Sequence, residues 1–311
     1  MKQILKVTSS PHIKHPDTTS GIMLDVIIAL LPACAYGCII FGWYALLLLA
    51  TCVASAVLSE YVWNFLLKKE NTIGDLSAVV TGLLLGMNLP PRLPLWMAVI
   101  GSMVAIIVVK QMFGGIGCNF ANPAITARIV LLVSFPAAMT SFISPVDAVT
   151  TATPLMGATS FGPTVKQLFF GMHSGCIGET SAFLLLVGGI YLLIRRVISP
   201  IIPFCFVGSV ALLTLISGGS VATSVFGGGI MLGAIFMATD YTTSPTTNCG
   251  KVVFGLGCGI ITFVIRNFAS LPEGVSYSIL LMNILVPYIN KLTLKKPFGY
   301  VKPQKEVKAD A

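Results

Sequence analysis

Apolar runs long enough to cross a membrane recur along the whole chain. Several reach the roughly 20 residues that a helix needs to span the hydrocarbon layer. Only 10% of the 311 residues are charged, against about 25% in soluble domains. We therefore predict an all-α polytopic membrane protein, residues 1–311 forming a single transmembrane domain of about ten helices. The predicted segments are 22–42, 44–67, 75–89, 95–113, 123–142, 182–194, 197–217, 225–239, 252–270 and 276–293.

Two of these segments are short and bounded by Gly or Pro, namely 75–89 and 225–239. Each contains a similar pair of glycines, Gly82 with Gly86 and Gly229 with Gly233. Five spans separate the copies, and an odd number reverses their direction. This pattern indicates two inverted five-helix repeats with short discontinuous helices, an architecture that places ligands near the membrane midplane. Chance similarity between Gly-rich helices is the alternative interpretation.

The basic residues orient the chain. With the N-terminus in the cytoplasm, all of the 19 Lys and Arg residues except Arg92, Lys166 and Arg266 lie at cytoplasmic ends or tails, as the positive-inside rule requires. Residues 1–21 and 294–311 are then cytoplasmic tails. The stretch 143–181 then lies on the extracytoplasmic side of the membrane. No cleavable signal is visible, so we expect the first apolar segment to belong to the mature protein.

Ionisable side chains in or beside predicted spans mark an ion path or a site by default. We expect the basic ones near helix ends, Lys110, Arg128 and Arg266, to extend to the membrane surface. Asp240 opens a hydroxyl-rich stretch whose oxygens suit a hard cation. Both a cation path and a helix-end cap fit it. The acidic members of the set are Asp25, Glu60, Asp75, Glu179 and Asp240.

Two polar loops are candidate cofactor sites. The run Asp147–Leu155 contains Thr150, Thr151 and Thr153 but no Cys, His or Lys, so it offers hydroxyls for attachment and no catalytic group. The Gly-rich loop from Gly114 includes Asn119 and Asn122, whose amides suit the amide and imide edge of a flavin or a quinone. We predict no metal site, because the eight cysteines form no CxxC pair. We also predict no catalytic residue.

These motifs together resemble one known family. They are Ser10–His12, Thr81–Leu85 with Leu89–Pro91, Phe113–Gly117 with Asn119 and Asn122–Ala124, Asp147–Leu155, Gly175–Ser181, Met237–Asp240 with Thr243–Pro245, and Met282–Asn283 with Pro287. The family contains the D subunit of the Rnf complex, a membrane ferredoxin:NAD oxidoreductase, and the B subunit of the sodium-pumping NADH:quinone oxidoreductase. Its length makes the chain more similar to the Rnf subunit.

The resemblance implies two flavins. In the family, FMN is joined through its phosphate to a threonine of an S/T-G-A-T motif, which matches Thr150–Thr153 and makes Thr153 the attachment point. Thr151 replaces the usual glycine, and Thr159 in Gly157–Thr159 is a less well matched alternative. The Gly-rich loop is tied in the paralogue to a non-covalent riboflavin, which would contact Asn119 and Asn122. Acidic residues are tied there to sodium passage, a role carried over to Asp240.

The implied function is that of a membrane redox subunit. Electrons would pass from reduced ferredoxin to NAD through several subunits, coupled to outward movement of Na⁺ or H⁺. The expected partners are the other Rnf subunits and membrane lipid, with ferredoxin and NAD contacted indirectly and no nucleic acid. The expected location is the bacterial cytoplasmic (inner) membrane. A urea-channel-like protein or secondary transporter without a redox cofactor is the alternative, but it would have no use for the threonine motif. A purely structural scaffold would leave both loops unexplained.

Overall fold

The protein is described from a computed structural model that covers residues 18–69, 71–142, 164–171, 173–269 and 274–294. Within these ranges the regular structure is entirely helical. Helices begin close to the predicted segment starts and follow one another in the predicted order. The prediction of an all-α chain is therefore confirmed.

The first half of the chain contains five of the predicted segments. They are α1 (Thr19–Phe41), α2 (Trp43–Leu66), α3 (Ser77–Met87), α4 (Leu95–Met103) with its continuation η2 (Val104–Gln111), and α5 (Pro123–Ser134). The continuation η2 is a π-helix, a form often found at functional sites. Segment 123–142 is shorter than predicted, because α5 ends at Ser134 and Pro136 begins the separate turn α6 (Pro136–Met139). A short 3₁₀ turn, η1 (Ile73–Asp75), precedes α3.

The second half repeats the count of five. Its segments are α8 (Ala182–Ile194), α9 (Ile201–Ile216), α11 (Ile230–Leu232) with the π-helix η5 (Gly233–Met237), α12 (Asn248–Phe268) and α13 (Val275–Thr293). Three short elements complete it: α7 (Val165–Phe170), η4 (Ile177–Glu179) and α10 (Val221–Phe226).

Length and surface identify the chain as a membrane protein. In the part of the chain that the structure describes, four helices, α1, α2, α12 and α13, are long and apolar enough to cross a bilayer. Five more apolar helices have 10–17 residues. Large apolar side chains are exposed along the long helices, for example Ile39, Phe65 and Leu292. Exposure of this kind along whole helices is unfavourable in water and expected in lipid.

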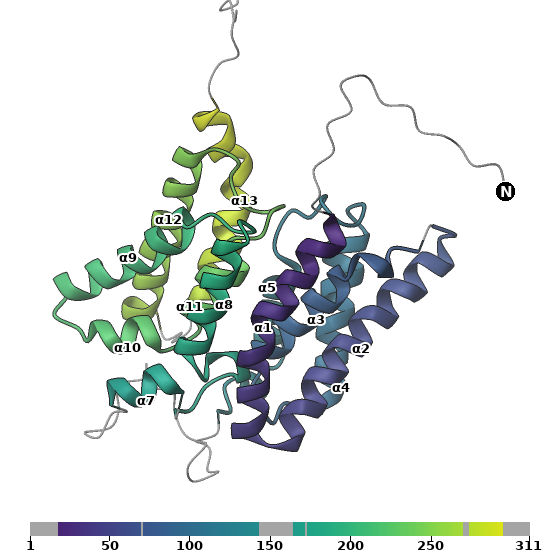
Figure 1. The fold of residues 1–311 in the computed structure, drawn as a ribbon, viewed down its shortest axis with the longest axis horizontal. Helices are drawn as coiled ribbons and strands as arrows, with labels where there is room; N and C mark the ends of the chain where they lie inside the picture. Colours follow the sequence, from purple (N-terminus) through teal and green to yellow (C-terminus); the bar gives the residue numbers. More distant parts are fainter. Residues whose placement is uncertain (1–17, 70, 143–163, 172, 270–273, 295–311) are drawn as a thin grey trace, which may run out of the picture.

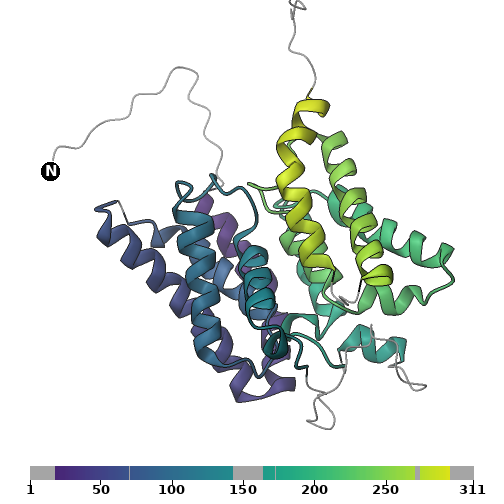
Figure 2. The same cartoon turned by 180° about the vertical axis from the view of Figure 1, so that it is seen from behind.

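The two halves pack against each other in a reciprocal way (Figure 1). The first helices of each half, α1 and α8, are in contact, and so are the fifth helices, α5 and α13. Within each half the second helix packs on the fourth, α2 on α4 and α9 on α12. Two five-helix repeats related by a two-fold axis would produce this pairing. Seen from behind, the purple-to-blue and green-to-yellow halves again lie side by side (Figure 2).

The paired glycines occupy the third segment of each half but have different roles. Gly82 lies inside α3, where a Cβ would stand 2.8 Å from the Cys52 carbonyl oxygen of α2. Gly229 instead precedes α11 with a left-handed φ of 63°, a conformation that favours glycine. The paired glycines therefore correspond in their position along each half, but their backbone conformations and contacts differ.

The first and last described helices reach the same end of the molecule. The start of α1 and the end of α13 lie at the same end of the molecule, at the top of Figure 1, and α7 and α10 lie at the opposite end. The assignment of these two ends to the cytoplasmic and extracytoplasmic sides stays a prediction from the basic residues.

Candidate functional site

The predicted site residues divide into two groups. Asp147, Thr150, Thr151 and Thr153 lie outside the described residues, so the attachment of a flavin to Thr153 stays a prediction. Asn119, Asn122 and Asp240 lie within them, and all three line one cavity. The structure thus joins two loops that are more than 110 residues apart in the sequence.

The cavity lies where the two halves meet. The first half contributes α1, α3, η2 and the loop that leads into α5, and the second contributes the end of α8, η5 and residues 239–242. Its volume is about 110 Å³, several times the roughly 10–15 Å³ that one water needs by the same measure. Its walls are largely apolar, including Val26, Leu84 and Phe236, with a few polar groups among them. This composition is typical of sites for small molecules and cofactors.

Asn122 is first of all a structural residue. Its Oδ1 accepts from the backbone N–H groups of Ala124 and Ile125, at 3.0 and 3.3 Å, and so caps the N-terminus of α5. Its Nδ2 donates to the Met237 carbonyl at 3.2 Å, which ties the first half to the end of η5. Most of its hydrogen-bonding capacity is therefore used within the protein, and it shapes the wall of the cavity.

Asn119 has hydrogen-bonding capacity to spare. Its Oδ1 is buried and has no hydrogen-bond partner among the described residues. A buried acceptor without a donor is unfavourable by about 1–3 kcal/mol. Because Asn119 lines the cavity, a ligand with an N–H group would satisfy this atom. The imide N–H of a flavin is such a group.

Asp240 follows η5 on the second-half side of the cavity. Its Oδ2 accepts from the hydroxyls of Thr242 and Thr243, both at 3.2 Å. Burial raises the pKa of the Asp240 carboxyl above its usual range, and the hydrogen bonds from these threonines act in the opposite direction. Asp240 therefore organises its own loop and also faces the cavity, so both sequence interpretations keep a basis in the geometry.

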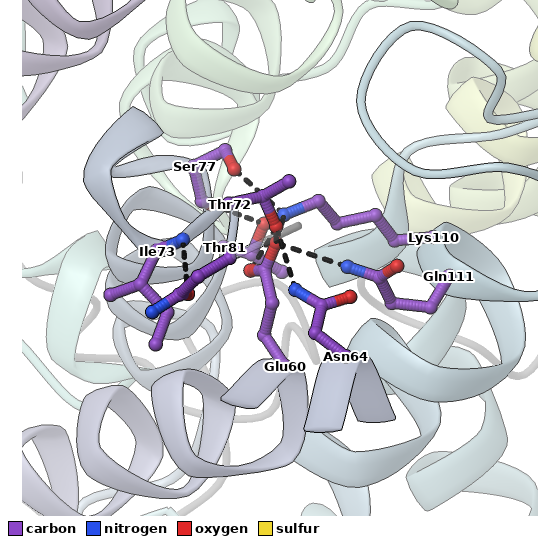
Figure 3. Close-up of polar contacts among 9 residues, drawn as sticks. Glu60, Asn64, Thr72, Ile73, Ser77, Thr81, Lys110 and Gln111 are labelled. Atoms are coloured by element: carbon purple, nitrogen blue, oxygen red, sulfur yellow. Dashed lines mark hydrogen bonds and ion pairs between the residues drawn. The ribbon is translucent and has the colours of Figure 1, made fainter. Parts of the chain in front are cut away.

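A buried ion pair adjoins the cavity, and the sequence did not predict it (Figure 3). Lys110 Nζ donates to both carboxylate oxygens of Glu60, at 2.9 and 2.8 Å, and to Ser77 Oγ at 2.7 Å. Glu60 Oε1 also accepts from Thr72 and Gln111, at 2.6 and 3.0 Å. Lys110 and Ser77 line the cavity. The prediction that Lys110 extends to the membrane surface is wrong, because a carboxylate on α2 draws it inward.

The same correction applies to Arg128. It is buried on α5 and donates to Asn88 Oδ1 and Ser276 Oγ, both at 3.0 Å. Its Nη2 also lies 3.4 Å from Cys176 Sγ and 3.9 Å from Glu179 Oε1. Asn88 directly follows α3, Ser276 lies in α13, and Cys176 and Glu179 lie at the two ends of the turn η4. Arg128 is therefore a central link between the halves. It no longer counts among the basic residues at cytoplasmic ends.

Arg266 also turns inward, at the end of α12. It donates to the carbonyl oxygens of Ser224, Gly227 and Gly228 at 2.6–3.3 Å. It thereby stabilises the link between α10 and α11, where helix ends leave carbonyls without partners. Asp25 is an acid whose hydrogen-bonding capacity is satisfied within the protein: it accepts from Tyr191 at 2.8 Å and from Arg195 at 3.1 Å.

Asn283 is a further link that the sequence marked only as part of a motif. Oriented to satisfy both neighbours, its amide donates to the Thr243 carbonyl and accepts from the Asn122 backbone N–H, each at 3.1 Å. Asn283 thus connects α13 to the two loops that carry Asn122 and Asp240. Asn283 does not line the cavity itself, but it connects two loops that do.

Comparison with known proteins gives a consistent result. Residues 6–299 match the model of the NQR2, RnfD, RnfE family. The chain is 49% identical to the D subunit of the Na(+)-translocating ferredoxin:NAD(+) oxidoreductase complex of Acetobacterium woodii, over 98% of both proteins. It is 43% identical to the D subunit of the proton-translocating ferredoxin:NAD(+) oxidoreductase complex of Clostridium ljungdahlii, over 96% of this chain and 97% of that protein. The D subunit of an ion-translocating oxidoreductase complex from Stutzerimonas stutzeri is 37% identical, over 89% of this chain and 91% of that protein.

Proposed function

Since the chain belongs to the NQR2, RnfD, RnfE family, we propose that it is the D subunit of an ion-translocating ferredoxin:NAD oxidoreductase complex in the bacterial cytoplasmic membrane. The relatives that carry this name align over nearly their whole length. One of them is named for Na⁺ and the other for protons, so similarity leaves the ion open. The protein acts with its partner subunits and has no catalysis of its own. The channel or carrier alternative rests on the helix pattern alone.

Two flavins fit this role. FMN is joined by a phosphoester to Thr153 on the extracytoplasmic side, with Asp147, Thr150 and Thr151 in the same motif. Riboflavin, held without a covalent bond, occupies the cavity between the halves. The observation that carries the second assignment is the buried, unpartnered Oδ1 of Asn119 in the cavity wall. A flavin accepts one or two electrons, and the protein supplies its position and its electrostatic surroundings.

Charge and geometry both support one orientation. The cavity is lined by residues near the end of α8, among them Leu192, Val197 and Ile198, and this end is followed by the basic pair Arg195 and Arg196. With the N- and C-termini in the cytoplasm, the cavity opens on the cytoplasmic side and Thr153 lies on the other. The two flavins would then stand on opposite sides of the membrane, as a relay across it requires.

Covalent attachment is tested by denaturing the protein after co-expression with a flavin transferase. Flavin fluorescence should migrate with the polypeptide in a denaturing gel and disappear completely in Thr153→Ala, because no other hydroxyl in the motif replaces the acceptor. Thr159→Ala is the matched control and should keep the fluorescence. Fluorescence that survives in Thr153→Ala and disappears in Thr159→Ala would move the site.

The cavity is tested by quantifying the flavin that denaturation releases from the assembled complex. Asn119→Ala should weaken retention about tenfold, the equivalent of one hydrogen bond. Asp240→Asn, on the other side of the cavity, should keep the flavin and instead slow ion transport if Asp240 belongs to the ion path. Asn267→Ala, at an exposed position of α12, is the control. Unchanged flavin content in Asn119→Ala would exclude this assignment.

A further inference from the structure

A continuous chain of hydrogen bonds connects the protein surface with the cavity. It begins at Thr72, which is exposed in the loop between α2 and α3. The Thr72 hydroxyl donates to Glu60 Oε1 at 2.6 Å, and Glu60 accepts from Lys110 at 2.8 Å. Lys110 donates to Ser77 Oγ at 2.7 Å. Ser77 and Lys110 line the cavity, and Glu60 and Thr72 do not, so the series of hydrogen bonds has an outer end at Thr72 and an inner end at Ser77.

Every link in this chain can carry a proton. Hydroxyls both donate and accept, a carboxylate accepts, and an ammonium donates. Asn64 Nδ2 donates to Thr72 Oγ1 at 3.0 Å, which leaves the Thr72 hydrogen directed at Glu60. Gln111 fixes the same carboxylate oxygen from the other side at 3.0 Å. The donors and acceptors are therefore already aligned.

We propose that Thr72, Glu60, Lys110 and Ser77 form a proton relay from the surface to the cavity. The inference rests on the proposed function, since it requires a flavin in the cavity that takes up a proton together with its electrons. The electrons come from the partner subunits. Relays of ionisable side chains are a recurrent use of charged residues inside membrane proteins, and here the ion pair is positioned to serve the redox reaction.

The relay balances in two steps. In the first, an N–H bond of the Lys110 ammonium breaks, its proton passes to Ser77 Oγ, and the Ser77 hydroxyl proton passes to the reduced flavin. This leaves a neutral Lys110 beside the Glu60 carboxylate. In the second, a water at the surface gives a proton to Thr72 Oγ1, the Thr72 proton passes to Glu60, and Glu60 returns it to Lys110.

The burial of the pair supplies the direction of this transfer. Glu60 and Lys110 are 1% and 2% exposed. Once Lys110 has lost its proton, the Glu60 carboxylate is a buried charge without a counter-ion, an unfavourable state. Taking up a proton from Thr72 removes this charge. Glu60 itself does not line the cavity; the only acid that does, among the described residues, is Asp240, whose carboxylate is engaged by Thr242 and Thr243.

The sharpest test changes the exposed outer link. Thr72→Val keeps the side-chain shape and removes the hydroxyl, whereas Thr72→Ser keeps the hydroxyl. The assembled complex in lipid vesicles is mixed with reduced ferredoxin, while flavin absorbance and proton uptake are followed together, the latter with a pH dye, in H₂O and D₂O. Thr72→Val should slow proton uptake about a hundredfold, the lower end of what a positioned proton-transfer group contributes. Thr72→Ser should behave like the unmodified complex.

Further variants separate this role from a structural one. Glu60→Gln should block uptake as strongly as Thr72→Val. Asp25→Asn, which breaks another ion pair beside the cavity, should leave uptake unchanged. If the Thr72→Val complex still contains the non-covalent flavin but takes up protons at the normal rate, the relay is overturned and the cavity assignment stands. If the unmodified complex releases no non-covalent flavin, the cavity assignment fails and the relay fails with it.

Discussion

Replacing Arg128 with methionine should lower the free energy of unfolding by about 3–5 kcal/mol, the range found when one partner of a buried ion pair is removed. The guanidinium is the only positive charge that the described residues place against the buried Glu179, 3.9 Å away. Its loss also leaves Asn88 Oδ1 and Ser276 Oγ without their donor. The measurement is the thermal midpoint and the folded yield of the complex in detergent.

Two variants show whether the stranded charge causes this loss. Arg128→Met combined with Glu179→Gln should recover part of the stability, because the orphaned carboxylate is then neutral. Arg195→Met also removes a paired cation, but that side chain is 55% exposed, so the cost should be at most about 1 kcal/mol. An Arg128→Met protein as stable as Arg195→Met would contradict the central role of Arg128.

The helical segments could be predicted because the bilayer fixes their length. A run of about 20 apolar residues has few other uses, and even the short segments became α3 and the α11–η5 pair. The inverted arrangement was indicated by two pairs of glycines and by counting spans. The pairing of α1 with α8 and of α5 with α13 supports it, although neither contact follows from the sequence pattern itself.

The direction of the basic side chains could not be predicted. The sequence pattern of a lysine near the end of a span is the same whether its side chain reaches lipid headgroups or a buried carboxylate. Lys110 turns inward because Glu60 lies on α2, 50 residues earlier. Arg128 finds Glu179, about as far along the chain in the other direction. The sequence did mark both acids as unusual residues in or beside spans. It did not show which basic side chain pairs with each of them.

Some of the residues that line the cavity could be predicted from the sequence, but their convergence on one cavity could not. The sequence identified Asn119, Asn122 and Asp240 as separate candidate residues, but it did not bring them together. Their convergence depends on Asn122 reaching Met237 and on Asn283 joining both loops, contacts set by helix packing. The sequence also treated Asn119 and Asn122 as equivalent ligands, whereas the structure makes Asn122 a helix cap and leaves Asn119 Oδ1 available.

Gly188→Val should open the contact between the halves and empty the cavity. A Cβ at Gly188 of α8 would stand 2.3 Å from the Ala29 carbonyl oxygen of α1 and 3.1 Å from Phe236 of η5, so the helices must separate. Overpacking of this kind costs about 3 kcal/mol. Since α1 and η5 line the cavity, its walls would move and the non-covalent flavin should be lost, as measured by release on denaturation.

Gly208→Val provides the matched control, because a Cβ at this exposed position of α9 meets no atom within 4 Å. Its thermal midpoint and flavin content should equal those of the unmodified protein. The covalent flavin supplies a second comparison, since its attachment depends on a threonine hydroxyl and not on the fit between α1 and α8. Gly188→Val should therefore lose the non-covalent flavin, while the fluorescence of the covalent flavin stays with the denatured polypeptide. Loss of both flavins would instead indicate a chain that fails to fold before modification, and retention of both would show that the contact between α1 and α8 does not shape the cavity.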